Sequence, residues 1–291
     1  MSKVTDGSYG SLGTPIGADS YVAVQASGPA VKIGTHADAR DYFNMKQSTA
    51  SPTTADVTGV VNTLHLLDIS GLTASRNFVL PATAAVNDLV GVSITTGDNT
   101  HALILKADTG DSIIASTTTY TATEWTRLLM AGETVFFRCI VANSTWIVEY
   151  DGRIPSYATG YPNDISTNSA ATATVAPLVN AISDSGGMLD TTANFRIDIR
   201  RAGNYEVNVS MRGLNALSAA QAQNVYAYKN GAALLSMQIR TASTSVEQCA
   251  VAKGFPLAVG DYIQLYFLHT QVNLGVRGSS QVTWCGVTEI L

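Results

Sequence analysis

The sequence predicts an all-β protein built from a short N-terminal arm and two β-domains. Between about residues 60 and 155, short apolar runs rich in β-branched residues recur at regular intervals, and no helical period links them. Apolar and polar residues then alternate strictly in Phe195–Arg200 and in Tyr205–Met211, which is typical of strands with one buried and one solvent-exposed face. Asn230-Gly231 adds a strong hairpin signal, because a type I′ turn needs positive φ at both central residues.

Length and composition point to several cores and to assembly. At 291 residues the chain can hold two cores and an appendage. Apolar residues make up 46% and charged residues only 13%, about half of the ~25% charged fraction that is usual for soluble domains. We therefore expect much of the surface to face other protein, in an oligomer or a larger assembly.

Charge and cysteine usage exclude several classes of partner. The net charge is −5 and the 17 basic residues are scattered, so no stripe is predicted that could neutralise a run of phosphates, which argues against nucleic acid. The N-terminus lacks the apolar core of a signal peptide and no apolar run reaches about 18 residues, so we expect a soluble chain made in the cytosol, without membrane insertion. Cys139, Cys249 and Cys285 are too few and too far apart for a disulfide framework, and we expect buried hydrophobes.

Residues 1–58 are expected to form an attachment arm and a linker. Short extended runs occur at Tyr21–Gln25 and Val31–Ile33, and Thr35 is a candidate N-cap for a helix that continues to about Met45. The arm is too small to bury the apolar face of this helix, so we expect it to dock on another surface. The candidate anchor residues are Tyr21, Val24, Ile33, Tyr42 and Phe43.

Two breaks divide the rest of the chain into a β-rich module, 59–155, and a second β-domain, 156–291. A polar segment containing Pro52 precedes the first, and small polar residues with Pro155 and Pro162 separate the two. In the first module, Asp108 and Asp111 flank Thr-Gly, a spacing that could ligate calcium, although an ordinary turn is the simpler interpretation.

The second β-domain shows a series of turns between strands. Gly203 stands in a tight corner where it can take positive φ, and Gly260-Asp261 turns the chain into another apolar run. The final run, 282–291, has apolar residues on both faces, with Val282, Trp284 and Ile290 on one and Cys285, Val287 and Leu291 on the other. A strand that is apolar on both faces is expected to lie between its own core and another surface, most simply that of a neighbouring subunit.

In their order, these pieces resemble the globular jelly roll of the complement-component and tumour-necrosis-factor superfamily. The resemblance covers about the last 125 residues, and it implies a jelly-roll sandwich that assembles as a homotrimer. Arg201 departs from it, because the family usually has proline before this corner. The matching fold-defining residues are Phe195, Gly203, Tyr205, Asn230, Gly231, Gly260, Asp261 and Gly286, with Lys229, Leu257 and Trp284 beside them.

Two earlier segments resemble proteins of tailed phages. Phe78–Thr83, Val86–Val90 and a closing strand with Trp146 before Asp151-Gly152 are similar to a module of phage fibre and appendage proteins. The segment from Gly17 to Ile33 resembles their N-terminal attachment segments. Together the resemblances imply a virion protein, assembled in the host cytoplasm, whose arm binds other virion proteins of the capsid or tail.

The sequence offers no catalytic, metal or cofactor motif. It contains no Gly-x-Ser-x-Gly elbow, no phosphate-binding Gly-rich loop and no His-Glu-x-x-His helix. Aromatic residues could instead form a sugar-binding shelf for host-surface glycan or close the trimer axis, and we favour the trimer axis. The candidates are Tyr226, Tyr228, Tyr262, Tyr266 and Trp284.

The leading hypothesis is a non-enzymatic structural protein of a tailed-phage virion, either a head fibre or capsid decoration or a tail fibre or appendage. Its N-terminus would anchor it, and the trimeric jelly roll would contact the host surface. One alternative is a carbohydrate-active depolymerase, which would need two acids held roughly 5 to 10 Å apart, whereas the acids here mostly fall in turns. The other alternative, a freestanding lectin, predicts secretion.

Overall fold

A computed structural model describes residues 45–166, 172–214, 221–240, 248–270 and 275–291, together with the backbones of strands β1 (Tyr21–Ala23) and β2 (Val31–Ile33). Within these residues the protein is all-β and contains no helix. β1 and β2 pair antiparallel, with Tyr21 opposite Ile33. The helix expected from Thr35, with Tyr42 and Phe43, and the anchor residue Val24 lie outside the described residues.

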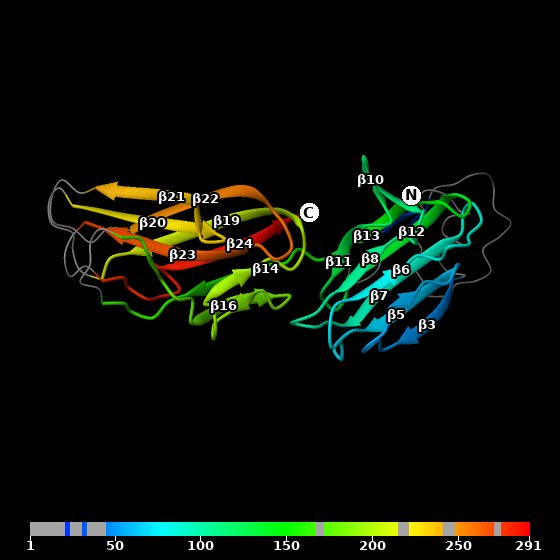
Figure 1. Cartoon of the computed structure of the whole chain (residues 1–291), viewed down its shortest axis with the longest axis horizontal. Helices are drawn as coiled ribbons and strands as arrows, with labels where there is room; N and C mark the ends of the chain where they lie inside the picture. Colours follow the sequence, from blue (N-terminus) through cyan, green and yellow to red (C-terminus); the bar gives the residue numbers. More distant parts are fainter. Residues whose placement is uncertain are drawn as a thin grey trace, which may run out of the picture.

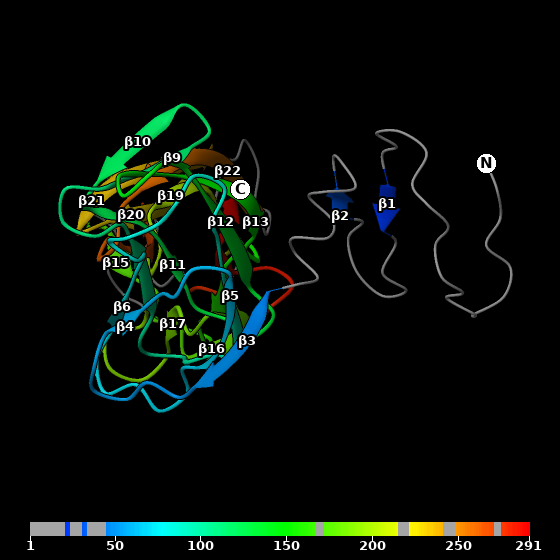
Figure 2. The same cartoon turned by 90° about the vertical axis from the view of Figure 1, so that its right-hand side faces the viewer.

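The described chain forms two β-modules that lie end to end along one axis (Figure 1). Figure 2 looks along that axis, with the middle module in front of the C-terminal one. Each module has its own hydrophobic core, one drawn from Leu67 to Trp146 and the other from Ala158 to Val287.

The middle module alternates between two sheets. In chain order its strands are β3 (Lys46–Ala50), β4 (Val57–Thr58), β5 (Thr63–Asp68), β6 (Arg76–Val79), β7 (Leu89–Thr96), β8 (Leu103–Lys106), β9 (Ser112–Ala115), β10 (Thr118–Thr121), β11 (Glu124–Leu128), β12 (Thr134–Val141) and β13 (Thr145–Gly152). One sheet has the order β10-β9-β13-β12-β7-β5-β3 and the other β11-β8-β6-β4.

The first six strands of this module wind as a parallel coil. β3, β5 and β7 pair parallel in one sheet, and β4, β6 and β8 pair parallel in the other. Parallel neighbours normally need a long crossover, usually a helix. Here the crossover is a strand of the opposite sheet, so the apolar runs seen in the sequence become successive turns of one coil. Phe78, Phe137 and Trp146 fill the space between the sheets and are fully buried.

The C-terminal module is a jelly roll. Its strands are β14 (Tyr157–Tyr161), β15 (Thr174–Val175), β16 (Asn180–Ser185), β17 (Leu189–Asp190), β18 (Arg196–Asp198), β19 (Gly203–Arg212), β20 (Ala222–Lys229), β21 (Ala232–Arg240), β22 (Gln248–Leu257), β23 (Tyr262–His269) and β24 (Trp284–Ile290). The sheets have the orders β16-β14-β24-β19-β22 and β17-β18-β23-β20-β21, and β15 pairs with β23.

The strand pairing itself defines this fold. Of the eight main strands, the outermost pair in the chain, β14 and β24, lie side by side, and so do β18 and β23, β19 and β22, and β20 and β21, all antiparallel. A long hairpin that wraps around a core gives this nested order, which is the jelly roll. The alternation predicted for β19 is present, with Tyr205, Val207 and Val209 fully buried.

Three details differ from the sequence expectations. The strand expected from Phe195 covers only Arg196–Asp198, because Phe195 has φ of +53° and turns the chain instead of extending it. Gly203 is not among the residues with positive φ; it opens β19, and a Cβ there would lie 3.4 Å from a carboxylate oxygen of Glu289. Leu291 follows the end of β24 and is exposed, so it does not share the inner face with Cys285 and Val287.

The turn residues hold two neighbouring turns of the jelly roll together. Asn230 and Gly231 have φ of +52° and +81°, and Gly260 has +88°. The Asn230 side chain donates to an Asp261 carboxylate oxygen at 2.7 Å and accepts the N–H of Tyr262 at 2.9 Å. The β20–β21 turn is therefore fastened to the β22–β23 turn.

Candidate functional site

The aromatic residues singled out from the sequence lie on two opposite faces of the jelly roll. Tyr226, Tyr228, Tyr262 and Tyr266 share the outer face of the six-stranded sheet, because the residues that alternate with them, such as Ala227 and Leu265, are in the core. Trp284 lies on the outer face of the five-stranded sheet, since Cys285 next to it points into the same core. The five rings therefore cannot form one surface.

The tyrosine face, defined as Tyr226, Tyr228, Tyr262 and Tyr266, is a ring cluster with polar groups around it. Tyr228 and Tyr266 stack with centroids 4.0 Å apart, and Tyr226 meets Tyr228 edge-on at 5.8 Å. The Arg196 guanidinium lies 4.3 Å from the centroid of the Tyr262 ring. Burial raises the pKa of Tyr226, with the neighbouring Tyr228 adding to the effect. Three of these half-buried rings are packed on one another and the fourth on Arg196, so this face is preformed.

The tryptophan face, on the five-stranded sheet, carries uncovered apolar side chains. Tyr157 and Ile290 are 42% and 54% exposed, and the half-buried Trp284 lies on the same strand as Ile290. Gly286, between them on this face, admits no side chain, because a Cβ would lie 2.3 Å from the Asn208 side-chain oxygen. A glycine keeps the centre of this face flat.

A third apolar surface, the open edge, lies where both sheets end. β21 is the last strand of one sheet and β22 is the last strand of the other (Figure 1). Met237 is 38% exposed there. Further apolar side chains of these strands pack on the core but are only partly buried: Leu234, Leu235, Ile239, Val251 and Phe255.

The two modules are joined by a buried ionic cluster around Arg201. Its guanidinium contacts carboxylate oxygens of Glu133, from the middle module, and of Glu289, the latter at 3.0 Å. All three side chains are almost completely inaccessible to solvent. Arg201 also donates to the carbonyls of Arg127 at 2.8 Å and Ile154 at 3.1 Å. The charges are paired and hydrogen-bonded, as buried charges must be.

Both carboxylates are held by further donors. Glu133 accepts the N–H groups of Met130 at 2.9 Å and of Ile154 at 3.1 Å. Glu289 accepts the N–H and the hydroxyl of Ser156 at 3.0 and 2.9 Å. The chain that links the modules thus contributes to the cluster, and the geometry at the junction is fixed.

The preceding residue, Arg200, contacts another loop of the middle module. Its guanidinium donates to the carbonyls of Asp98 at 3.1 Å and His101 at 2.5 Å, in the loop between β7 and β8. Two consecutive arginines at one jelly-roll corner therefore bind two separate loops of the neighbouring module.

The sequence showed only a weak signal for this junction. Arg201 stood out as a departure from the family pattern at a corner, and the structure explains the departure by its role between the modules. Nothing local marks Glu133 or Glu289 as its partners, because they lie 68 and 88 residues away in the chain.

The described residues hold no group of three or more His, Cys, Asp or Glu side chains that could bind a metal ion. Asp111 N–H donates to the Asp108 carbonyl at 3.1 Å, as in a simple turn. His65 Nε2 accepts the N–H of Val60 at 3.0 Å, and burial lowers the pKa of His65. In the part of the chain that the structure covers, no helix has the length and apolar character to span a membrane.

Comparisons with known proteins give structural similarity alone. No family model and no curated protein sequence matches the chain. Solved structures of murine APRIL at pH 5.0 and pH 8.0 match with TM-scores of 0.38 and 0.37 and identities of 17% and 18%, over 47% of this chain and all of theirs. The Eiger TNF of S. frugiperda matches with a TM-score of 0.33 and 12% identity, over 47% of this chain and 92% of its own.

These neighbours belong to the tumour-necrosis-factor family. Identity this low carries no functional information, and with TM-scores below 0.5 the jelly-roll assignment rests on the strand pairing instead. None of the comparisons bears on a phage origin.

Proposed function

We propose that this protein is a non-enzymatic structural and binding protein that works as a homotrimer. The observation that carries the proposal is the apolar surface left on the lone jelly roll, on the tryptophan face and at the open edge. Monomeric proteins rarely leave apolar surface of this kind exposed. Contacts with neighbouring subunits would remove it from water. The threefold state follows from the sequence resemblance to the complement-component and tumour-necrosis-factor superfamily.

The two outer faces would then have different roles. The tryptophan face and the open edge adjoin other subunits, because both carry uncovered aliphatic and aromatic side chains. The tyrosine face points outward and is free to contact a ligand, and stacked rings with a guanidinium at the rim suit the polar and apolar sides of a glycan. This division reverses the preference for the trimer axis that the sequence suggested for the tyrosines.

The finer proposal is a tailed-phage virion protein, assembled in the host cytoplasm, on the head or the tail. It is supported by three concordant resemblances in chain order: attachment arm, β-module and trimeric jelly roll. It is also supported by the buried ionic cluster around Arg201, which would hold the jelly roll in a fixed position on the module that the arm joins.

A deletion of residues 1–44 tests the anchoring role. Both hydrophobic cores lie C-terminal to this segment, so the shortened protein should remain a trimer. It should no longer be found on particles purified from a producing culture. Normal incorporation of the shortened protein would contradict the proposal. Incubation with host polysaccharide, followed by assay of released sugar, tests the depolymerase alternative, and we expect no release.

A further inference from the structure

The far end of the middle module, here called the distal pole, carries an unexplained apolar surface. β7 begins at this end with Leu89 and β12 ends there with Val141. The contacts to the jelly roll come from the opposite ends, through Asp98 and Glu133. Four large apolar side chains are exposed around the pole: Val60 (55%), Val86 (53%), Ile140 (38%) and Val141 (51%).

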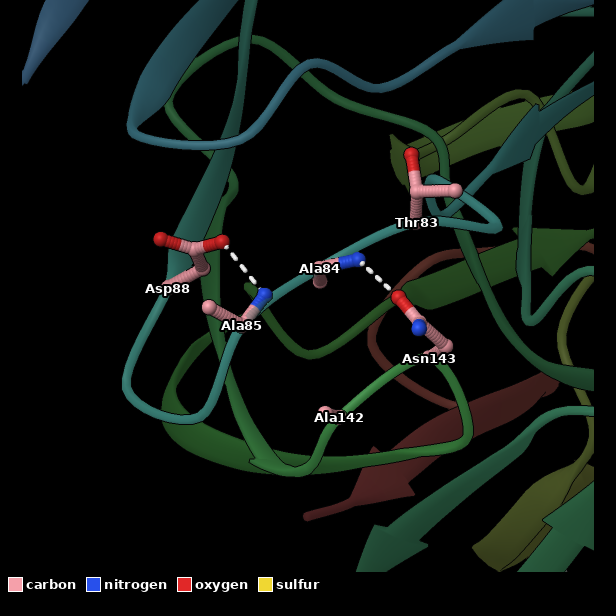
Figure 3. A pocket seen from close by; sticks show the side chains of 6 residues that line it. All are labelled: Thr83, Ala84, Ala85, Asp88, Ala142 and Asn143. Atoms are coloured by element: carbon pink, nitrogen blue, oxygen red, sulfur yellow. Dashed lines mark hydrogen bonds between the residues drawn. The ribbon is translucent and has the colours of Figure 1, made fainter.

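Two of these residues, Val86 and Val141, are next in the chain to Ala85 and Ala142, which line a shallow hollow of about 450 Å³ (Figure 3). It is lined by Thr83, Ala84, Ala85, Asp88, Ala142 and Asn143. Two of its polar side chains are hydrogen-bonded within it, since Ala84 N–H donates to the Asn143 side chain and Ala85 N–H donates to Asp88, both at 2.8 Å. The hollow therefore presents small apolar walls and few unused donors.

The middle module also begins at this pole. Lys46 N–H donates to the Asn62 carbonyl at 3.0 Å. The Asn62 side chain in turn donates to Asp88 at 2.9 Å and accepts the N–H of Leu89 at 3.1 Å. A continuous set of hydrogen bonds thus connects the start of β3, where residues 1–44 join the module, with the rim of the hollow.

We propose that the distal pole is a second contact surface for the particle protein that receives the arm. This inference rests on the proposed function and extends it from the arm to the folded module. The partner is a protein surface with protruding aliphatic or aromatic side chains that enter the hollow. The chain path favours this position, because residues 1–44 join the module at this pole and tether to it whatever binds them.

Other partner classes fit less well. A glycan would need many free hydrogen-bonding groups, whereas the side-chain oxygens of Asn143 and Asp88 in the hollow already accept backbone N–H groups. An anionic lipid surface or a nucleic acid would need basic residues, whereas the single charged side chain that lines the hollow is the carboxylate of Asp88.

The test uses full-length protein and particles purified from a culture that produces them without this chain. Wild type, Val86→Glu, Val141→Glu and the matched control Val175→Glu are titrated onto the particles. Val175 is 36% exposed on the jelly roll, far from the pole. We expect both pole variants to need a concentration at least about tenfold higher for half-saturation, as for central interface residues, while the control binds as wild type does.

The outcomes separate this inference from the function on which it rests. If wild type binds and the pole variants bind equally well, the pole inference is wrong and the anchoring role stands. If wild type does not bind particles at all, the proposed function fails and the pole inference falls with it. Flotation of wild type with phosphatidylcholine and phosphatidylglycerol vesicles, abolished by Val86→Glu, would replace the protein partner by lipid and also overturn the inference.

Discussion

At the scale of single residues, Arg201 determines how the two modules are connected. Its guanidinium is shared by the carboxylates of Glu133 and Glu289 in a site that excludes solvent. A buried ion pair adds little net stability compared with apolar packing, but loss of one member leaves the other charge unpaired and is costly. Removal of this arginine should therefore destabilise the folded state strongly, because two carboxylates would stay buried.

We predict that Arg201→Ala lowers the free energy of unfolding by about 3 to 5 kcal/mol, because both carboxylates lose their counter-charge while buried. Denaturant titration measures the change. The matched control is Arg196→Ala, whose pairing with Asp198 at 2.7 Å is partly exposed and should contribute under about 1 kcal/mol. Equal losses in the two variants would contradict a special role for the junction.

Tyr205 gives a prediction for alkaline pH. Burial, assisted by the nearby Glu289, raises the pKa of Tyr205 to about 12 from a usual 10. The folded state thus favours the neutral phenol, whose hydroxyl donates to the Arg201 carbonyl at 2.8 Å. This stabilisation is fully present below pH 10 and is lost as pH rises toward 12.

The free energy of unfolding of the wild type should therefore fall across this range. That of Tyr205→Phe should fall less steeply, because the variant has no phenol at this position to ionise. Parallel pH titrations of the two proteins, each followed by denaturant unfolding, supply the comparison. Identical slopes would show that Tyr205 does not carry the effect.

At the scale of elements, the hairpin between β20 and β21 depends on its glycine. Gly231 has φ of +81°, where a Cβ costs roughly 1–2 kcal/mol. Gly231→Ala should lower the free energy of unfolding by this amount. Gly254 is the matched control, since it has no positive φ and nothing within 4 Å of an added Cβ, so Gly254→Ala should be neutral or slightly stabilising. An unchanged free energy of unfolding in Gly231→Ala would contradict this turn geometry.

Elements with local signals could be predicted from the sequence. The Asn230-Gly231 turn and the alternation along β19 depend on backbone preference and on one buried face, which neighbouring residues encode. The parallel coil of the middle module could not be predicted, because its pairing joins segments such as β5 and β7 across other strands. The strand expected from Phe195 was wrong for a local reason. An aromatic residue favours strand, but Phe195 has positive φ directly after a turn in which the Asp190 carboxylate accepts the N–H groups of Ala193 and Asn194.

The candidate surfaces were only partly predictable for the same reason. Composition indicated that apolar surface would remain exposed, and the aromatic candidates do lie on outer faces of the sandwich. The division into a tyrosine face and a tryptophan face depends on which sheet each strand joins, and β23 and β24 are consecutive in the chain but lie in different sheets.

At the scale of the whole molecule, the described chain is a two-module unit with distinct ends (Figure 1). In the proposed function, the jelly roll presents faces for self-association and for ligand. Arg200 and Arg201 fix its position on the middle module, and the distal pole lies where residues 1–44 join that module. Loss of the arm should leave the trimer intact, since the apolar surfaces assigned to subunit contacts are all in the jelly roll.

The central claim is that the jelly roll covers its apolar faces by threefold self-association. Native mass spectrometry of the purified full-length protein at micromolar concentration tests it most directly. We predict a dominant species of three times the chain mass of 30.6 kDa, and a variant with Trp284 and Tyr157 both replaced by Glu that shifts toward one chain mass. A wild-type protein that remains at a single chain mass would contradict the claim.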